Sequence, residues 1–459
     1  MKNELNIYDK YKETGLFWLE KIPSHWSWLY LSQVCHEQKI KNTDGLEDNV
    51  LSLSYGKIIR KKNKDFGLVP KEYNTYQIVN NGNIILRLTD LQNDKKSLRT
   101  GLVKETGIIT SAYACLKTNN NPAYLHYLLN YYDLIKVFYG LGGGVRQSIG
   151  FNDIRKLQLP VPPQEEQIQI VHYLDNKLAK INKLIKAKKK QIELLKEQKQ
   201  AIINQAVTKG LDPNAKMKPS GVEWIGEIPI EWEIVPLKRV VKTVKTGSTP
   251  EGANQKFYET NGFDWFTPSD FNDKLFLTSA TRQLSELGIE KVKVFPANTV
   301  LMIGIGGTMG KVSISKNECS CNQQINAIIC DEKVCESYLA YYLRAKKQHI
   351  FDTAKYTTLP ILNQEETKSI PFILQSLTEQ QKIISFIEVK TKSIDKTINT
   401  IKNEIELITE YRTSLISEVV TGKIDVRGIA VEEVIAPEVD EEFDLDEEVE
   451  MEDFPESEV

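Results

Sequence analysis

The chain has 459 residues, 41% hydrophobic and 26% charged, which fits two or three soluble domains, each with its own core. No apolar run approaches the ~20 residues of a membrane-spanning helix, and the polar N-terminus lacks the apolar stretch of a signal peptide. The six cysteines form no Cys-x-x-Cys pair and the five histidines are scattered, which argues against a structural zinc site. We expect a protein of the reducing cytoplasm that binds no metal.

The net charge of −3 hides an asymmetry. From Val431 to Val459 the chain carries fifteen Asp or Glu and no Lys or Arg, so residues 1–430 carry +12. A basic body favours a polyanionic partner, although a lysine-rich solvated surface gives the same count.

The first informative segment is GLFWLEKIPSHW, Gly15 to Trp26, because it returns as GVEWIGEIPIEW at Gly221 to Trp232. Gly, Trp, Ile, Pro and Trp occupy matching positions, 206 residues apart. Four of the six tryptophans lie in these two opening segments, so chance is a poor explanation. The repeat predicts two halves of nearly equal length that begin in the same way.

Each half continues with a mixed block of strands and one helix. In the first half, strands are expected around 49–55, 75–79, 83–88 and 111–117, and a helix at 123–138. In the second half, strands are expected around 239–250, 299–306, 311–315 and 324–330, and a helix at 336–347. The two interiors differ in sequence, which suggests that each block recognises something different.

Each half ends in a long helical segment. Residues 166–212 align without a gap with residues 379–425, at an offset of 213. Apolar residues recur at three- and four-residue steps over about five heptads, which is the pattern of a coiled-coil seam. The seam residues are Leu174, Leu178, Ile181, Ile185, Ile192, Leu195 and Ile202, and then Ile387, Ile394, Ile398, Ile401, Ile405, Ile408, Leu415 and Val419; the polar exceptions are Lys188, Lys199, Thr391 and Arg412.

Two such apolar seams in one chain are most simply buried against each other. Antiparallel pairing of the helices would relate the two halves by a pseudo-twofold axis. Parallel pairing, or pairing with other proteins, stays open on pattern alone. We therefore predict an α+β protein in which two mixed α/β domains are separated by two long helices packed as an antiparallel coiled coil. The expected parts are a first domain at 1–160, a first helix at 161–212, a second domain at 213–371, a second helix at 372–429, and a disordered acidic tail at 430–459.

This arrangement resembles the specificity (S) subunit of type I restriction–modification systems, over essentially residues 1–429. The resemblance is carried by the opening segments and by GGGVRQSIGFNDIRKLQLPVPPQEEQ at Gly142, KTGSTP at Lys245, WFTPSDF at Trp265, GTMGKVSIS at Gly307 and NQQINAI at Asn322. Each motif is weak alone, but together, in order and duplicated, they are specific.

The resemblance implies two target-recognition domains that bind a bipartite, asymmetric site on double-stranded DNA. Such subunits are not enzymes: two methyltransferase (M) subunits dock on them to methylate adenine, and two endonuclease/motor (R) subunits add restriction of foreign DNA. S-adenosylmethionine, ATP and Mg²⁺ are then expected only on the partner subunits, and the chain itself is expected to hold no cofactor.

Phosphate contacts require cations, and base contacts use amide or guanidinium groups. The candidates are Arg60, Lys61, Lys62, Lys64, Lys95, Lys96, Arg99 and Arg146 in the first domain, and Lys245, Arg282, Lys311, Asn322, Gln323 and Gln324 in the second. KTGSTP and NQQINAI also match the family pattern, so their residues can equally belong to the scaffold.

Three segments resemble catalytic motifs without completing them. NPAY at Asn121 lacks the second proline of an adenine methyltransferase signature and fits a helix N-terminus. GIGGTMGK at Gly304 lacks the first glycine and the Ser/Thr of a phosphate loop and fits a tight turn. Asp94 and Lys96 in LTDLQNDKK are reminiscent of a nuclease metal site, but such residues are common in polar loops.

Other hypotheses remain. One is a protein-interaction scaffold whose helices join protein partners while its domains bind RNA or proteins, and another is a nuclease that acts alone. The acidic tail departs from the family pattern, and we hypothesise that it imitates DNA and shields the basic body.

Overall fold

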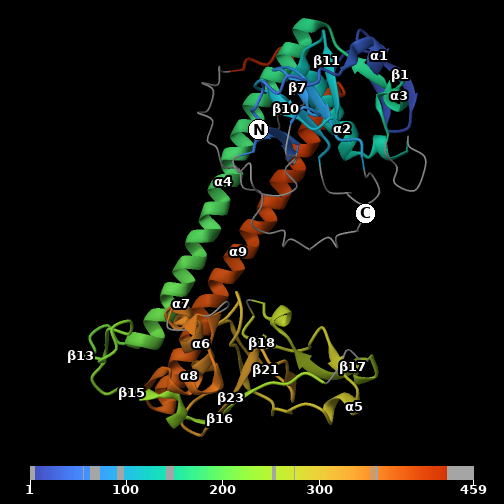
Figure 1. The fold of residues 1–459 in the computed structure, drawn as a ribbon. Helices are drawn as coiled ribbons and strands as arrows, with labels where there is room; N and C mark the ends of the chain where they lie inside the picture. Colours follow the sequence, from blue (N-terminus) through green and yellow to red (C-terminus); the bar gives the residue numbers. More distant parts are fainter. Residues whose placement is uncertain are drawn as a thin grey trace. The chain divides into compact units, whose positions relative to one another are not determined.

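The computed structural model describes residues 6–54, 56–61, 73–89, 98–140, 149–250, 255–272, 274–352, 355–356 and 360–431. The chain forms two compact units: unit 1 comprises residues 1–187 and 404–459, and unit 2 comprises residues 188–403. Helices and strands are mixed in both units (Figure 1), which confirms the predicted α+β class at this level.

A four-stranded antiparallel sheet forms the centre of unit 1. Its order is β4 (Cys35–Gln38), β11 (Ala114–Thr118), β8 (Ile84–Leu86) and β9 (Thr100–Leu102). All three residues of β8 are fully buried, which explains its continuous apolar sequence. Helix α2 (Pro122–Leu134) shares the core of this sheet. Two smaller pairs join β5 (Leu51–Ser54) to β6 (Lys57–Arg60), and β7 (Gln77–Val79) to β10 (Gly107–Ile109).

A five-stranded sheet forms the centre of unit 2. Its order is β16 (Val241–Thr246), β23 (Ile325–Cys330), β20 (Val300–Ile303), β21 (Val312–Ser315) and β18 (Phe276–Leu277). Helix α6 (Glu336–Ala345) shares its core. A second sheet combines β19 (Gln283–Leu284), β17 (Tyr258–Phe266) and β22 (Ser320–Cys321).

The two central sheets share one strand order. The series β4, β11, β8, β9 in unit 1 corresponds to β16, β23, β20, β21 in unit 2. Likewise β3 (Ser27–Tyr30) pairs with β12 (Gln158–Val161), and β15 (Glu233–Pro236) pairs with β26 (Pro371–Leu374). The repeat therefore continues through interiors that differ in sequence, because a sheet requires buried apolar residues of suitable volume rather than particular side chains.

Each opening segment supplies the second strand of a hairpin, and its final tryptophan packs against the end of a long helix. The hairpins are β1 (Tyr11–Leu16) with β2 (Leu19–Pro23), and β13 (Met217–Pro219) with β14 (Glu227–Pro229). Trp26 lies against Gly422 and Trp232 against Gly210, where an added Cβ would come within 3.1 and 3.2 Å of the indole rings. Both glycines have positive φ, 74° and 77°, and follow a helix terminus. This shared contact explains why the opening segment occurs twice.

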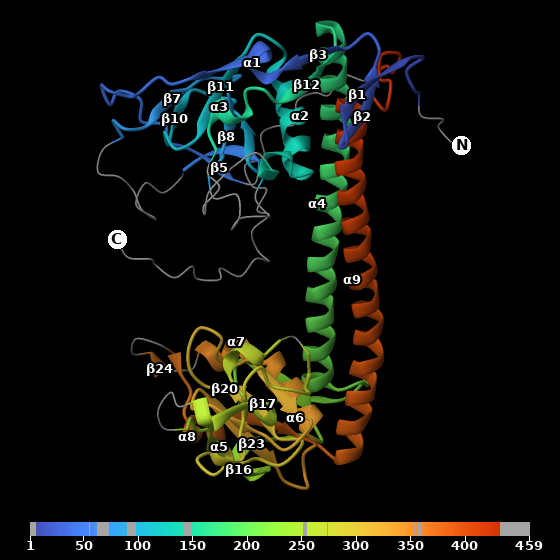
Figure 2. The ribbon, with the colours of Figure 1, turned by 90° about the vertical axis from the view of Figure 1, so that its right-hand side faces the viewer.

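The repeated helical segments form α4 (Gln164–Lys209) and α9 (Leu377–Val420), and each helix contributes to both units. Within unit 1, the early α4 residues Leu174 and Leu178 share a core with the late α9 residues Leu415 and Val419. Within unit 2, late α4 meets early α9, as in the ion pair of Lys199 with Asp395. The two helices are therefore antiparallel within each unit, where Figure 2 shows them side by side.

Every residue of the predicted seam is at least half-buried. The fully buried ones are Leu174, Leu178, Ile185, Ile192, Ile387, Ile398, Ile401, Leu415 and Val419, and the half-buried ones are Ile181, Leu195, Ile202, Ile394, Ile405 and Ile408. The polar exception Thr391 is also buried.

Candidate nucleic-acid interface

In unit 2, the loop that follows β16 packs on the loop that precedes β23. Gly247 N donates to Ile325 O at 3.0 Å, and Ser248 N donates to Cys321 O at 2.8 Å. A Cβ on Gly247 would lie 2.2 Å from Cys321 O, so only glycine permits this approach. The KTGSTP and NQQ segments thus share one surface.

Arg282 lies beside this surface and packs against two aromatic rings. Its guanidinium carbon lies 4.3 Å from the ring centroid of Tyr258 and 5.2 Å from that of Trp265. Trp265 Nε1 donates to Ser248 O at 2.9 Å, and Lys293 Nζ donates to Thr246 O at 2.9 Å. The rings orient an exposed cation without neutralising it. We define the unit 2 loop surface as Lys245, Ser248, Thr249, Arg282, Lys293 and Gln323.

The three predicted amide side chains differ in availability. Asn322 is 8% exposed, and its Nδ2 donates to Gln324 Oε1 at 2.9 Å. Its Oδ1 accepts from Gln324 N at 3.1 Å, so these two residues shape the loop. Gln323 is exposed, and its Oε1 accepts from Thr249 Oγ1. Gln323 is therefore the amide of the three that is most open to a base edge.

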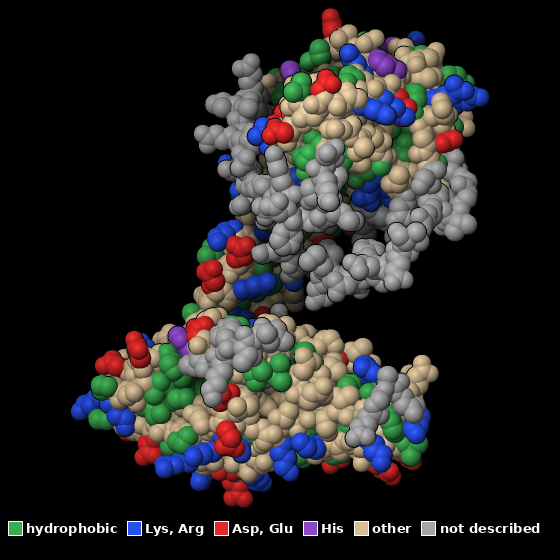
Figure 3. Space-filling model, in the orientation of Figure 1, with side chains coloured by type: hydrophobic (Ala, Val, Ile, Leu, Met, Phe, Trp, Pro, Cys, Tyr) green, Lys and Arg blue, Asp and Glu red, His purple; other side chains and the backbone are tan. Residues whose placement is uncertain are grey.

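Residues 304–311 form the turn between β20 and β21, which confirms the turn interpretation of GIGGTMGK. Gly306 and Gly310 have positive φ, 99° and 81°. Gly304 N donates to Gln324 O at 2.8 Å, which ties the turn to the NQQ segment. Lys311, the predicted phosphate contact in this turn, is half-buried. Along the lower edge of unit 2 in Figure 3, several Lys and Arg side chains reach the surface.

In unit 1, Arg60 and Lys61 lie at the exposed end of β6. Arg60 Nε lies 2.8 and 2.9 Å from the two carboxylate oxygens of Glu105. Hydrogen bonding to Arg60 lowers the pKa of Glu105. A phosphate would have to compete with this carboxylate for the Arg60 guanidinium, whereas Lys61 is simply exposed.

Arg99 lies in the core of unit 1, with none of its surface exposed. Its Nη1 donates to Arg87 O at 3.2 Å and to Thr89 O at 2.7 Å, and its Nε donates to Tyr139 Oη at 3.1 Å. The guanidinium is thus enclosed by groups of its own unit, and this placement favours a structural role over a contact with DNA. A basic residue in a polar stretch gives no indication of burial at the sequence level.

Several predicted residues lie outside the described residues. They are Lys62, Lys64, Lys95, Lys96 and Arg146, together with Asp94 of the nuclease-like segment and the acidic tail from residue 432 onward.

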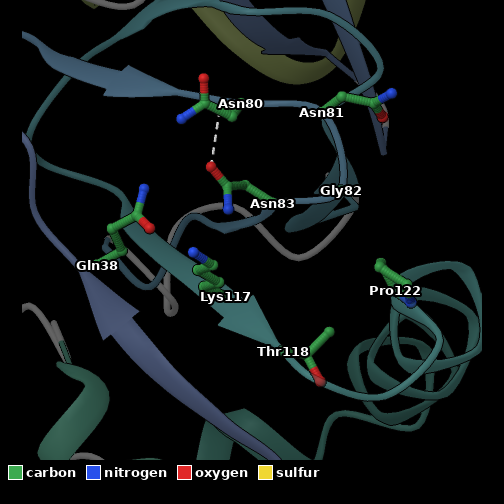
Figure 4. Close-up of a pocket in the computed structure, with 8 residues that line it drawn as sticks. All are labelled: Gln38, Asn80, Asn81, Gly82, Asn83, Lys117, Thr118 and Pro122. Carbon is green, nitrogen blue, oxygen red and sulfur yellow. Dashed lines mark hydrogen bonds between the residues drawn. The ribbon is translucent and has the colours of Figure 1, made fainter.

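Unit 1 carries a polar hollow that its sequence pattern does not predict. It is lined by Gln38, Asn80, Asn81, Gly82, Asn83, Lys117, Thr118 and Pro122 (Figure 4). Asn80 N donates to Asn83 Oδ1 at 2.7 Å, and Gly82 has a φ of 87°. Gln38 Nε2 is buried and has no hydrogen-bond partner among the described residues. Amides beside a lysine suit contacts to bases and phosphates, but NNGN in a sequence signals only a turn.

A buried carboxylate in unit 1 serves to fasten the N-terminal segment. Glu166 is 5% exposed, and its Oε1 accepts from Tyr8 Oη at 2.5 Å and from Trp26 Nε1 at 2.9 Å. Its Oε2 lies 2.8 Å from His25 Nε2. Burial and the bond to Glu166 raise the pKa of Tyr8. These contacts hold the opening segment against the first turn of α4.

Other sequence signals have plain structural explanations. Asn121 is the N-cap of α2, with its Oδ1 accepting from Ala123 N and Tyr124 N at 3.0 and 3.2 Å, which confirms the helix-terminus interpretation of NPAY.

Within the described residues, no group of three or more His, Cys, Asp or Glu side chains is arranged to hold a metal ion. In the same part of the chain, no helix combines the length and apolarity needed to cross a membrane.

Comparisons with known proteins agree with these features. The profile of the family described as type I restriction modification DNA specificity domain matches residues 108–194 and 229–407. The putative type I restriction enzyme MjaX specificity subunit of Methanocaldococcus jannaschii is 28% identical over 323 residues, which cover 68% of this chain and 71% of the relative. The MjaVIII specificity subunit of the same organism is 26% identical over 380 residues, which cover 77% of this chain and 82% of the relative.

One solved structure of a type I R-M system, studied for complex assembly and conformational transition, contains a chain of similar fold. The TM-score is 0.65 at 16% sequence identity, and the match covers 88% of this chain and 99% of the other. At this identity the likeness concerns the fold alone.

Proposed function

Because the chain belongs to the type I restriction modification DNA specificity family, we propose that it recognises a two-part DNA sequence, one part through each unit. As a specificity subunit it contributes DNA recognition and no catalysis of its own.

The observation that carries the two-part proposal is a shared scaffold with unlike loops. Both units have the same strand order and the same hairpin-to-helix contact. Unit 2 presents an arginine held by aromatic rings beside an exposed amide, whereas unit 1 presents an asparagine-rich hollow beside a lysine. Similar scaffolds with different recognition groups suit two different half-sites, and hence an asymmetric target.

We further propose that α4 and α9 form one antiparallel coiled coil that relates the two units by a pseudo-twofold axis and sets the spacer between half-sites. The antiparallel contacts within each unit support this arrangement. At ~1.5 Å per residue, α4 is roughly 70 Å long.

The same proposal places this chain in a cytoplasmic complex with two M and two R subunits. S-adenosylmethionine, ATP and Mg²⁺ then act on the partner subunits, where methyl transfer, translocation and cleavage take place.

The test is duplex binding and footprinting with the full chain and its methyltransferase partners. We expect affinity to fall steeply with salt, and two protected tracts separated by an unprotected spacer. The alternative, a scaffold that binds RNA or proteins, predicts no sequence-dependent footprint and stronger binding to RNA of equal length. That result would overturn the proposal.

A further inference from the structure

Two neighbouring backbone segments of unit 1 enclose a second hollow, of about 370 Å³, which we call the Arg155 hollow. Its lining residues are Tyr30, Ser32, Arg155 and Lys156. The first two come from the end of β3 and the start of α1 (Leu31–Val34). The last two connect α3 (Phe151–Ile154) to β12, the strand that pairs with β3. The lining side chains therefore come from both segments of one β ladder.

Backbone hydrogen bonds fix the shape of the Arg155 hollow. Leu31 N donates to Leu157 O at 2.7 Å. Ser32 N donates to Arg155 O at 3.0 Å. Leu31 and Ile154 are fully buried in the core of unit 1, so both walls of the hollow are anchored to that core. A site whose backbone is held in this way loses little conformational freedom when a ligand binds.

The two cations of this hollow lack a counter-ion among the described residues. The side chains of Arg155 and Lys156 are exposed, and neither forms a hydrogen bond or an ion pair within the part of the chain that the structure describes. Asp153, the carboxylate nearest to them in sequence, accepts a hydrogen bond from Gly150 N at 2.8 Å. A guanidinium and an ammonium group beside two hydroxyls are donors that suit the oxygens of a phosphate group.

Unit 2 has a structurally equivalent place. Leu237 N donates to Ile370 O at 2.9 Å, which repeats the bond from Leu31 to Leu157. The two residues of this bond lie 206 and 213 positions after their counterparts, which are the offsets of the opening segment and of the helical repeat. The same backbone contact therefore frames both places.

The equivalent place in unit 2 contains an anion of its own. At the two offsets, the counterparts of the lining residues are Pro236, Lys238, Lys368 and Ser369. Two cations and one serine thus occur in each unit, although at exchanged positions. In α8 (Gln364–Ser369), Lys368 Nζ lies 2.6 Å from Glu365 Oε1, and this bond lowers the pKa of Glu365. The counterpart of Glu365 in unit 1 is the neutral Asn152.

We propose that the Arg155 hollow is a phosphate site that holds the backbone of duplex DNA, and that Glu365 takes the place of this phosphate in unit 2. The inference rests on the proposed recognition of DNA and adds a contact that does not depend on sequence. Phosphates are the same at every base pair, so the contact contributes affinity and position but no base specificity.

The chemistry of the lining favours a phosphodiester over a carboxylate of a partner protein. A guanidinium forms paired hydrogen bonds with phosphate oxygens, and the neighbouring lysine and hydroxyls supply further donors. Protein interfaces are instead centred on buried apolar or aromatic side chains, and Tyr30, the aromatic residue of this lining, is exposed. The charge of +12 on residues 1–430 also suits a polyanion.

Acetylation of lysines in the complex of the full chain with its methyltransferase partners tests the site. We expect a non-cognate duplex to protect Lys156 about fivefold at low ionic strength, and ~0.5 M salt to remove the protection. Lys368, which is already paired with Glu365, should be protected less than about twofold. Inorganic phosphate alone should give no comparable protection of Lys156.

The same experiment distinguishes other occupants of the hollow. Equal protection of Lys156 by inorganic phosphate and by duplex would show a site for free anions. Protection of Lys156 by the partner subunits before DNA is added would show a site for a protein. Either result would overturn the proposal.

Reciprocal exchanges between the units provide matched variants. Asn152→Glu, at an exposed position, places a carboxylate one helical turn before Arg155, which is the arrangement in unit 2. It should weaken cognate and non-cognate duplexes alike, about fivefold, and lower the salt slope by about one unit. Glu365→Asn should strengthen binding of both duplexes about threefold. Gln198→Glu, on an exposed part of α4, makes the same charge change as Asn152→Glu and should alter affinity less than about twofold.

These outcomes separate the phosphate site from the function on which it rests. Wild-type affinity and salt slope in Asn152→Glu, with the two-part footprint intact, would overturn the phosphate site alone. Weakening confined to the cognate duplex would show a base contact and would also overturn it. A wild-type complex that does not bind duplex DNA would overturn the proposed function itself.

Discussion

At the scale of single residues, Arg282 is an exposed cation of unit 2 with a defined position. Two aromatic rings hold its guanidinium, and Trp265 in turn is bonded to the KTGSTP loop. Pre-orientation lowers the entropy that a long side chain loses on binding.

We predict that Arg282→Gln weakens binding of the cognate duplex about tenfold and reduces the salt slope by about one unit if the contact is to a phosphate. Arg282→Lys keeps the charge but not the planar group that stacks on the rings, so its effect should be intermediate. Titrations at several salt concentrations measure both. Wild-type affinity in Arg282→Gln would remove this residue from the interface.

The sequence predicted the charge of such residues, but it did not predict whether the fold buries, pairs or exposes them. Arg60, Arg99 and Arg282 are equally basic in a linear sequence, yet one is paired with Glu105, one is fully buried and one is held exposed on aromatic rings. Burial and pairing depend on contacts between segments far apart in the chain. The hollow around Asn80 and Gln38 was missed for the same reason, since β4, β11 and the turn before β8 meet only in the folded unit.

At the scale of elements, the duplicated glutamines Gln167 and Gln380 join the start of each long helix to a shorter helix of the same unit. Gln167 Oε1 accepts from Asn121 N at 3.0 Å, at the start of α2. Gln380 Oε1 accepts from Cys335 N at 2.9 Å, at the start of α6. Both side chains are buried and also donate to backbone carbonyls, Gln167 to Pro162 O and Gln380 to Lys333 O.

We predict that Gln167→Ala and Gln380→Ala each lower the local free energy of unfolding by about 1–3 kcal/mol, because buried backbone groups lose their partners. Hydrogen exchange should become faster in α2 for the first variant and in α6 for the second. Gln198→Ala, at an exposed position of α4, is the matched control. Equal effects of Gln167→Ala and Gln198→Ala on α2 would show that this contact does not support the helix.

The elements differed in how well their sequences predicted them. Both long helices and the helices α2 and α6 were anticipated, because apolar periodicity over many residues is a strong signal. The expected strands correspond to β5, β7, β8 and β11 in unit 1 and to β16, β20, β21 and β23 in unit 2. Strands such as β9 and β10 were not anticipated, because three residues that include a glycine carry no periodicity and form only through pairing with neighbours.

At the scale of the whole molecule, duplication explains both the likeness and the difference of the two halves. The opening hairpins, the glycine that ends each long helix, and the buried glutamine near each helix start are repeated because each unit meets its helices in the same way. The loops between these fixed points differ in sequence between the two units. This division supports the proposal that the two units carry unlike recognition surfaces.

The most direct test of the spacing role of the helices is to map methyladenine across the genome of cells that carry this chain with its partner subunits. The map is compared before and after one heptad is deleted from each long helix, for example residues 187–193 and 401–407. Each deletion shortens a helix by ~10 Å, or ~3 base pairs at ~3.4 Å per step. We predict a split motif whose two halves are unchanged while its spacer shortens by about three base pairs. An unsplit motif, or the same spacer after a deletion that preserves methylation, would contradict the claim that paired helices hold two reading units at a fixed separation.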